Sequence, residues 1–259
     1  MRIKDISKLQ LPIFFLLISV LWGSCSTGSK KKKSLTVFAA ASLTDVMSKL
    51  ADDYKKATGV SLRLNFASSG VLARQIEGGA DYDYYISASK SWMTYIDSLK
   101  LVDRESVKTL AYNRMVAIVP IENKDFKLDS TNISNFPDLF KGRISIGDPA
   151  HVPAGKYAMQ IIRKNNWQDN LESRYLPAKD VRDALFMVEM GEVEMGMVYS
   201  SDAQKSKKVR VIYEFPVEDC ERISYFGAAN SKETPELKKF QEYMNTNKAV
   251  WVNHGFKLE

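Results

Sequence analysis

A strand followed by a serine and a helix occurs twice in succession, and this repeated unit constrains the fold more than any other feature. The first copy covers Leu35–Met47 with its serine at Ser42, and the second covers Leu62–Ile76 with Ser68 and Ser69. In each copy an apolar run of strand length ends at a hydroxyl, where an amphipathic helical pattern begins. Free backbone N–H groups and the positive end of the helix dipole meet there and attract anions. One copy alone is explained by an ordinary helix N-cap, whereas two copies facing one cleft predict an oxyanion receptor.

The start of the chain predicts a secretion signal and a tether. Residues 1–24 contain a basic start and the apolar run Leu11–Leu21, which is shorter than the ~20 residues that a membrane-spanning helix needs. Small residues then precede Cys25, as in a bacterial lipoprotein signal, in which the cysteine becomes the lipidated N-terminus. Trp22 departs from that pattern, and an ordinary secretory signal with an incidental cysteine is the alternative. Residues 25–33 are polar and lysine-rich, which is typical of a flexible tether.

The net charge of +6 does not indicate a nucleic-acid partner. Residues 1–24 hold three basic residues and one acidic residue, and four lysines follow at Lys30–Lys33, so the whole excess lies before Ser34. Proteins that bind nucleic acid carry a basic face on the folded domain itself. Cys220 is the one cysteine besides Cys25, so we expect no intrachain disulfide framework and interpret Cys220 as a partly buried filler.

Alternating strand and helix patterns predict an α/β fold with mixed, mostly parallel sheets flanked by helices. Strand-to-helix junctions recur in both halves of the chain, which favours two lobes with a binding cleft between them. We expect a first lobe built from residues 34–113 and 222–259, and a second lobe built from residues 114–221. The clearest expected helices cover residues 43–57, 70–77, 156–165 and 235–246, and the clearest strands cover residues 84–87, 114–119 and 143–146.

Five separated motifs follow one another along the chain. They are Val37–Thr44, Phe66–Ser69 with Leu72–Glu77, Gly147–Pro149 with His151–Gly155, Asp180–Arg182, and Val198–Ala203. Together they resemble the molybdate-binding proteins of bacterial molybdate ABC importers, and the similarity extends from about Leu35 to Phe256. The resemblance implies the two-lobed periplasmic-binding-protein fold of type II, with the ligand in the cleft between the lobes.

The resemblance also implies a set of ligand contacts made by neutral donors. They are the hydroxyl and N–H groups of Ser42 and Ser69, the backbone N–H groups of Ala154 and Val181, and the hydroxyl of Tyr199. Molybdenum, or tungsten, would be held as its oxyanion, with no cation ligands and no cofactor. A cavity with donors and no acceptor favours fully deprotonated anions over phosphate, which keeps a proton at neutral pH.

For the whole protein, the resemblance implies an extracytoplasmic receptor that is not an enzyme. We expect a monomer that is anchored to membrane lipid through Cys25 and passes its anion to the membrane permease of an importer. A receptor for sulfate or another oxyanion is the alternative within this class. An enzyme acting on a small phosphorylated substrate is the alternative from another class, but neither serine motif has a base beside it.

Some positions depart from the family pattern. Gly70 stands where a further Ser or Thr is common, and Tyr84-Tyr85 replaces the usual Leu-Phe. We interpret both tyrosines as strand packing. Asp83 is interpreted as a hinge or turn acid because a carboxylate repels a dianion, and His151 is interpreted as bracing its loop.

Overall fold

The computed structural model describes residues 34–230 and 234–258. The predicted signal at residues 1–24 and the tether at residues 25–33 with Cys25 lie outside the described residues. None of the helices in the described part has both the length and the apolar character that a membrane span requires.

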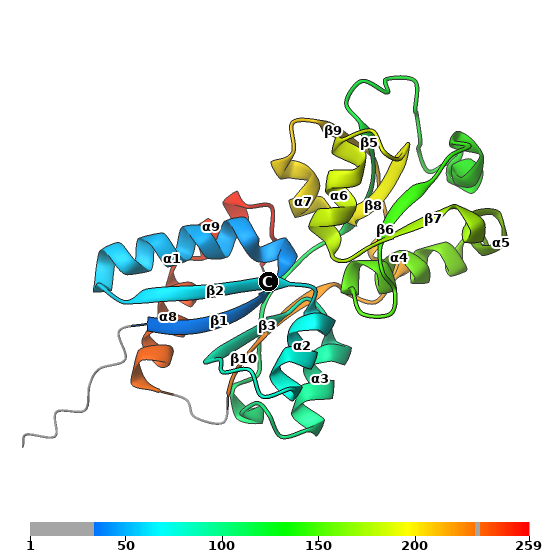
Figure 1. Cartoon of the computed structure of the whole chain (residues 1–259). Helices are drawn as coiled ribbons and strands as arrows, with labels where there is room; N and C mark the ends of the chain where they lie inside the picture. The colour runs from blue at the N-terminus through cyan, green and yellow to red at the C-terminus, as the bar shows by residue number, and fades with distance from the viewer. Residues whose placement is uncertain (1–33, 231–233, 259) are drawn as a thin grey trace, which may run out of the picture. The chain divides into compact units, whose positions relative to one another are not determined.

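The first lobe is built on a five-stranded mixed sheet with the order β2-β1-β3-β10-β4 (Figure 1). Strands β2, β1 and β3 run parallel, whereas β10 is antiparallel to both β3 and β4. The strands are β1 (Ser34–Ala40), β2 (Ser61–Ala67), β3 (Tyr84–Ser87), β4 (Lys108–Tyr112) and β10 (Ser224–Ala229).

Helices cover both faces of this sheet because side chains alternate between the faces along each strand. Val37 and Ala39 of β1 pack in one apolar cluster with helices α1, α8 and α9, whereas Phe38 packs in another with α2 and α3. The helices are α1 (Thr44–Thr58), α2 (Ser69–Glu77), α3 (Lys90–Ser98), α8 (Pro235–Thr246) and α9 (Lys248–Asn253). The short 3₁₀ helices are η1 (Ala41–Leu43) and η2 (Arg104–Ser106).

The second lobe has a five-stranded sheet of the same kind, with the order β7-β6-β8-β5-β9. Its strands are β5 (Met115–Pro120), β6 (Ile144–Gly147), β7 (Tyr175–Ala178), β8 (Met195–Tyr199) and β9 (Val209–Glu214). Its α-helices are α4 (Pro153–Lys164), α5 (Gln168–Leu171), α6 (Val181–Glu189) and α7 (Ser200–Lys205), and its 3₁₀ helices are η3 (Ile133–Leu139), η4 (Glu172–Arg174) and η5 (Val217–Asp219).

The expected α/β layering is confirmed, with less parallel pairing than we expected. In the described residues each sheet has two parallel and two antiparallel strand pairs. The antiparallel pairs arise because β10 and β5 enter their sheets directly from the other lobe, without a crossover helix. Local residues set two helix ends: α1 ends at Gly59 with φ of 74°, and the Asp180 side chain caps α6.

The chain passes between the two sheets at two neighbouring places. Strand β4 ends at Tyr112 and β5 begins at Met115, and the return path leads from β9 into β10. These connections are hydrogen bonded to each other, because Asn113 N donates to Ile223 O at 3.1 Å.

Candidate functional site

Four helix N-termini and one tyrosine meet at a small cavity between the lobes. The cavity measures about 10 Å³ and includes all five residues expected as ligand contacts. It is lined by Ala40, Ala41, Ser42, Ser68, Ser69, Ala88, Val152, Pro153, Ala154, Asp180, Val181 and Tyr199. The structure therefore brings together the five expected contacts, which span 157 positions from Ser42 to Tyr199, while their role as ligands stays a prediction.

Ser69 is held so that its hydroxyl proton is available. It is the first residue of α2 and is fully buried. Its Oγ accepts a hydrogen bond from Ala88 N at 3.0 Å, and its carbonyl accepts one from Tyr85 Oη at 2.8 Å. With an acceptor position already used, the Ser69 hydroxyl is prepared to donate to an anion.

Ser42 lies in η1, directly before α1, and has a buried hydroxyl partner. Its Oγ lies 2.9 Å from Tyr225 Oη, on strand β10. Asn113 Nδ2 donates to the same Tyr225 oxygen at 3.2 Å. Tyr225 and Asn113 were not expected from the sequence, because Tyr225 lies 183 residues from Ser42 and no local pattern links them.

The second lobe contributes backbone donors. Ala154 follows Pro153 at the start of α4, and Val181 is the first residue of α6. First-turn N–H groups have no partner within their own helix. Gly155 allows α4 to begin this close to β6, because a Cβ at Gly155 would come within 1.9 Å of Gly147 O.

Tyr199 supplies a buried hydroxyl donor at the edge of the cavity. It is 1 % exposed at the end of β8, and its buried hydroxyl has no hydrogen bond within the described residues. A buried hydroxyl without a partner costs free energy unless a ligand or a water bonds to it, so the Tyr199 hydroxyl is free to donate into the cavity. Burial raises the pKa of Tyr199 well above its usual value, which keeps the hydroxyl protonated and able to donate.

One acid, Asp180, lines the cavity, and the nearby Arg182 guanidinium, which also donates to Ser42 O at 3.4 Å, is paired with two carboxylates. Asp180 Oδ1 accepts from Arg182 N at 2.9 Å and Asp183 N at 3.0 Å. The Arg182 side chain pairs with Asp45 of α1 at 2.6 Å and with buried Asp202 of α7 at 2.5 Å. Among the described residues, no Lys, Arg or His side chain lines this cavity, and no cluster of His, Cys, Asp and Glu could hold a metal ion. An anion here would therefore be bound by dipoles and hydrogen bonds.

A family model for "Bacterial extracellular solute-binding protein" matches residues 35–257. This chain belongs to that family. Molybdate-binding protein ModA of Escherichia coli is 40 % identical over 87 % of this chain and 89 % of its own length. A putative ABC transporter substrate-binding lipoprotein of Bacillus subtilis, YvgL, is 33 % identical over 96 % of both chains. These matches confirm the resemblance inferred from the five motifs.

The fold is shared with solved members of this class. The substrate-binding domain of a putative molybdenum ABC transporter from Clostridium difficile superposes with a TM-score of 0.68. It is 31 % identical and covers 87 % of this chain and 99 % of its own. The two-lobed solute-binding fold predicted from the sequence is confirmed.

The departures from the family pattern have clear structural roles. Gly70 N donates to His151 O at 3.1 Å, which joins the lobes, and a Cβ at Gly70 would come within 2.6 Å of the Trp92 ring. Asp83 Oδ2 accepts from Thr36 N at 2.7 Å and does not line the cavity. Tyr85 does more than pack, because its hydroxyl holds the Ser69 carbonyl.

Cys220 is partly buried, and its pKa is raised to about 11, first by burial and then by Asp219 and Glu221. A thiol with so high a pKa is almost wholly protonated at neutral pH, so Cys220 is a poor nucleophile.

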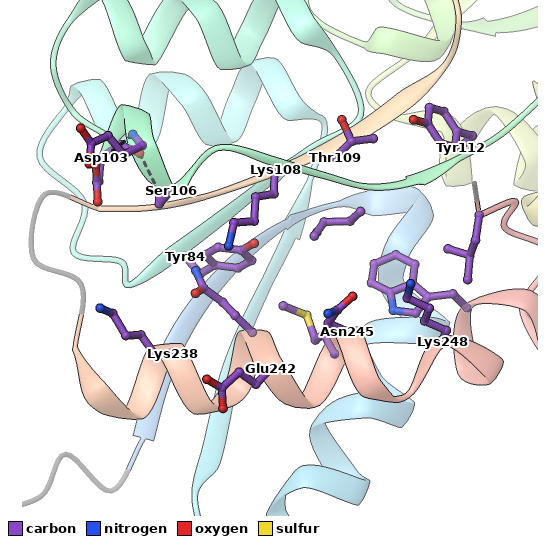
Figure 2. A pocket seen from close by; sticks show the side chains of 16 residues that line it. Tyr84, Asp103, Ser106, Lys108, Thr109, Tyr112, Lys238, Glu242, Asn245 and Lys248 are labelled. Carbon is purple, nitrogen blue, oxygen red and sulfur yellow. Dashed lines mark hydrogen bonds between the residues drawn. The ribbon is translucent and has the colours of Figure 1, made fainter.

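A second cavity, of about 670 Å³, lies between β4 and helices α8 and α9 (Figure 2). None of the five expected ligand residues lines it. Lys108, Lys238 and Lys248 share its wall with Asp103 and Glu242. Mixed charge of this kind does not favour a bare dianion, so we do not assign an oxyanion site to this cavity.

Proposed function

We propose that this protein captures molybdate outside the cytoplasm and delivers it to the permease of an ABC importer. The observation that carries the proposal is the buried Tyr199 hydroxyl, which has no hydrogen-bond partner in the described part of the chain and lies where four helix N-termini meet. Each hydrogen bond to a charged group contributes about 1.5–3 kcal/mol, and each helix terminus adds ~0.3–1 kcal/mol. Together these donors offset much of the cost of desolvating a dianion.

The ligand contacts in this proposal are the Ser42 and Ser69 hydroxyl and N–H groups, the Ala154 and Val181 N–H groups and the Tyr199 hydroxyl. Tungstate has the same shape and charge, so we expect it to bind as well. Neither a cofactor nor a cation is needed, and no catalytic step is proposed.

Calorimetric titration with molybdate, tungstate, sulfate and phosphate tests the ligand. We expect tight binding of molybdate and tungstate, and far weaker binding of phosphate. Sulfate binding as tight as that of molybdate would replace the proposal by a sulfate receptor. Turnover of phosphorylated small molecules would replace it by an enzyme.

A paired variant tests the site. Ser42→Ala with Ser69→Ala removes two donors, and we expect it to lose at least about 100-fold in affinity while remaining folded. Ser98→Ala, on the exposed surface of α3, is the matched control and should bind like the wild type. Unchanged affinity in the double variant would contradict the assigned contacts.

We also propose that Cys25 carries the lipid anchor, that residues 1–24 are removed, and that the mature protein is a monomer. The lobes would be residues 34–113 with 222–259, and residues 114–221. The lipoprotein description of the Bacillus subtilis relative supports the anchor. Mass spectrometry of the mature protein tests it, and an unmodified Cys25 in the membrane fraction would contradict it.

A further inference from the structure

Asn113 lies at the passage from the first lobe to the second and reaches the anion site through one tyrosine. It is 6 % exposed and connects β4 to β5. Its backbone N–H bonds to the returning chain at Ile223, and its side chain contacts Ser201 of α7 and Tyr225 of β10. One side chain therefore joins both lobes at the point where they are connected.

The orientation of the Asn113 amide follows from its partners. Oδ1 accepts from Arg114 N at 2.9 Å and from Ser201 N at 3.5 Å, and both of these groups can only donate. The Nδ2 group must then donate, and its acceptors are Ser201 Oγ at 2.8 Å and Tyr225 Oη at 3.2 Å. An amide rotated by 180° would place two N–H groups against two N–H groups.

The hydrogen bond between Asn113 and Tyr225 bears on the direction of the bond between Tyr225 and Ser42. Tyr225 Oη accepts from Asn113, and Ser42 Oγ, 2.9 Å away, is the one acceptor among the described residues within hydrogen-bond distance of the Tyr225 hydroxyl. If Ser42 donated to Tyr225 instead, the buried Tyr225 proton would have no acceptor there, so we assign the donor to Tyr225. Burial raises the pKa of Tyr225 above its usual value, so that proton is retained at neutral pH. Ser42 Oγ then accepts from Tyr225, and its own proton is left for the cavity. Bonds in such a chain polarise one another.

We propose that Asn113 is a positioning residue which, acting through Tyr225, makes the Ser42 hydroxyl an obligate donor to the bound oxyanion. This extends the proposed function, on which it rests, to the choice among oxyanions. A Ser42 that can only donate suits a fully deprotonated anion. It gives no acceptor to the proton that a hydrogen phosphate carries.

Asn113→Asp tests the direction of the hydrogen bonds from Asn113 through Tyr225 to Ser42, with almost no change in the shape of the side chain. A carboxylate can only accept, so Tyr225 would donate to it, Ser42 would donate to Tyr225, and a Ser42 lone pair would face the cavity. We expect molybdate affinity to fall by about 10- to 100-fold, measured by calorimetry. The affinity ratio of molybdate to phosphate should fall as well.

Asn113→Asp in the Tyr225→Phe background separates two effects on affinity: the loss of the hydrogen-bond relay from Asn113 through Tyr225 to Ser42, and the added negative charge. Without the phenol oxygen the hydrogen-bond relay is broken, so the loss of molybdate affinity caused by Asn113→Asp should then be at least about 5-fold smaller than in the wild-type background. The loss that remains is the share due to charge repulsion. Equal losses in both backgrounds, or no loss in either, would overturn the proposal.

Tyr225→Phe alone gives a second readout if Asn113→Asp does not fold. It frees the Ser42 hydroxyl to rotate, so the molybdate-to-phosphate ratio should narrow by at least about 3-fold; an unchanged ratio would overturn the proposal. The titrations use the tetrahedral oxyanion that the wild type binds. If the wild type binds sulfate in place of molybdate, the proposed function is corrected, and the role of Asn113 is tested with sulfate in the same variants. If the wild type binds no oxyanion, both the proposed function and the role of Asn113 are overturned.

Discussion

Whether a hydroxyl at this site can donate to a ligand depends on the hydrogen bonds that its oxygen already accepts. Ser69 Oγ receives the Ala88 N–H, and Ser42 Oγ lies beside the Tyr225 hydroxyl. The Tyr199 hydroxyl differs, because it has no partner within the described residues. Removing the Tyr199 hydroxyl therefore breaks no hydrogen bond within the described residues, so its effect on binding can be separated from an effect on stability.

Tyr199→Phe should lower oxyanion affinity by about 10- to 100-fold, because one hydrogen bond to a charged ligand is lost. The melting temperature without ligand should stay the same or rise slightly, since a buried unpaired hydroxyl is removed. Calorimetric titration and thermal unfolding measure both quantities. Tyr175→Phe is the matched control, because the buried Tyr175 hydroxyl also has no partner among residues 34–230 and 234–258 but does not line the cavity. A Tyr199 variant that binds like the control would contradict the prediction.

Gly70→Ala should destabilise the protein by about 1–3 kcal/mol, because the added Cβ would lie 2.5 Å from His151 O and 2.6 Å from the Trp92 ring. The strain falls on a bond between the lobes, so oxyanion affinity should drop as well. Denaturant unfolding and calorimetric titration measure the two effects. Wild-type stability and wild-type affinity would contradict the prediction, because they would show that His151 and Trp92 move aside at no cost in free energy.

At the scale of elements, helices α4 and α6 bring bare N–H groups to the cavity by different means. Pro153 begins α4 and carries no N–H group itself, and Gly155 allows close contact with β6. The α6 terminus is capped by Asp180, a carboxylate at the wall of a proposed anion site. The cap stabilises the helix, but its charge opposes the ligand.

Asp180→Asn keeps the capping oxygen and removes the charge. Oxyanion affinity should rise by ~3-fold or more, and stability should fall by no more than about 1 kcal/mol. Asp183→Asn is the matched control, since Asp183 lies in the same helical turn but not at the cavity. An equal gain from both variants would assign the effect to the helix terminus in general.

Asp202 should make stability depend on pH. Burial raises its pKa to about 7, and this outweighs the opposing attraction of Arg182. Between about pH 4 and pH 7 the unfolded chain loses this proton while the folded chain keeps it. The free energy of unfolding therefore falls as pH rises, by on the order of 1 kcal/mol per pH unit. Asp202→Asn should flatten this dependence in denaturant unfolding, and an unchanged slope would contradict the assignment.

At the scale of the whole molecule, direct bonds between the lobes surround the cavity. Tyr157 Oη donates to Ala88 O at 3.2 Å, Gly70 N donates to His151 O, and Arg182 pairs with Asp45. Such contacts contribute to affinity in a receptor whose lobes close on the ligand, because they are made together with it.

Asp45→Asn should lower oxyanion affinity by ~2- to 5-fold, because partly exposed ion pairs contribute about 0.2–1 kcal/mol. The loss should shrink at high salt as screening weakens the wild-type pair. Asp53→Asn on the same helix is the control, since its partner Lys49 lies within the lobe. Equal affinities of the wild type and both variants at low salt would contradict a role for the Asp45 pair in binding.

The sequence by itself determined many of the elements and placed their ends to within about three residues, since α4 begins at Pro153 where the helix was expected from residue 156. Strand periodicity, Gly59 and the Asp180 cap are local signals, because they act through hydrogen bonds and backbone angles within a few residues. The two strand–serine–helix units belong to this class. The family motifs then led to Ala154 and Val181, whose side chains carry no polar signal.

Only the tertiary structure determined which residues hold and orient those donors. Asn113, Tyr225 and the Asp45–Arg182 pair depend on contacts between segments more than 100 residues apart, and no periodicity records them. The direction of each hydroxyl depends on which neighbour occupies its lone pairs, and that is settled only when the chain has folded. The serines can therefore be predicted from local sequence, but their action as hydrogen-bond donors depends on tertiary contacts.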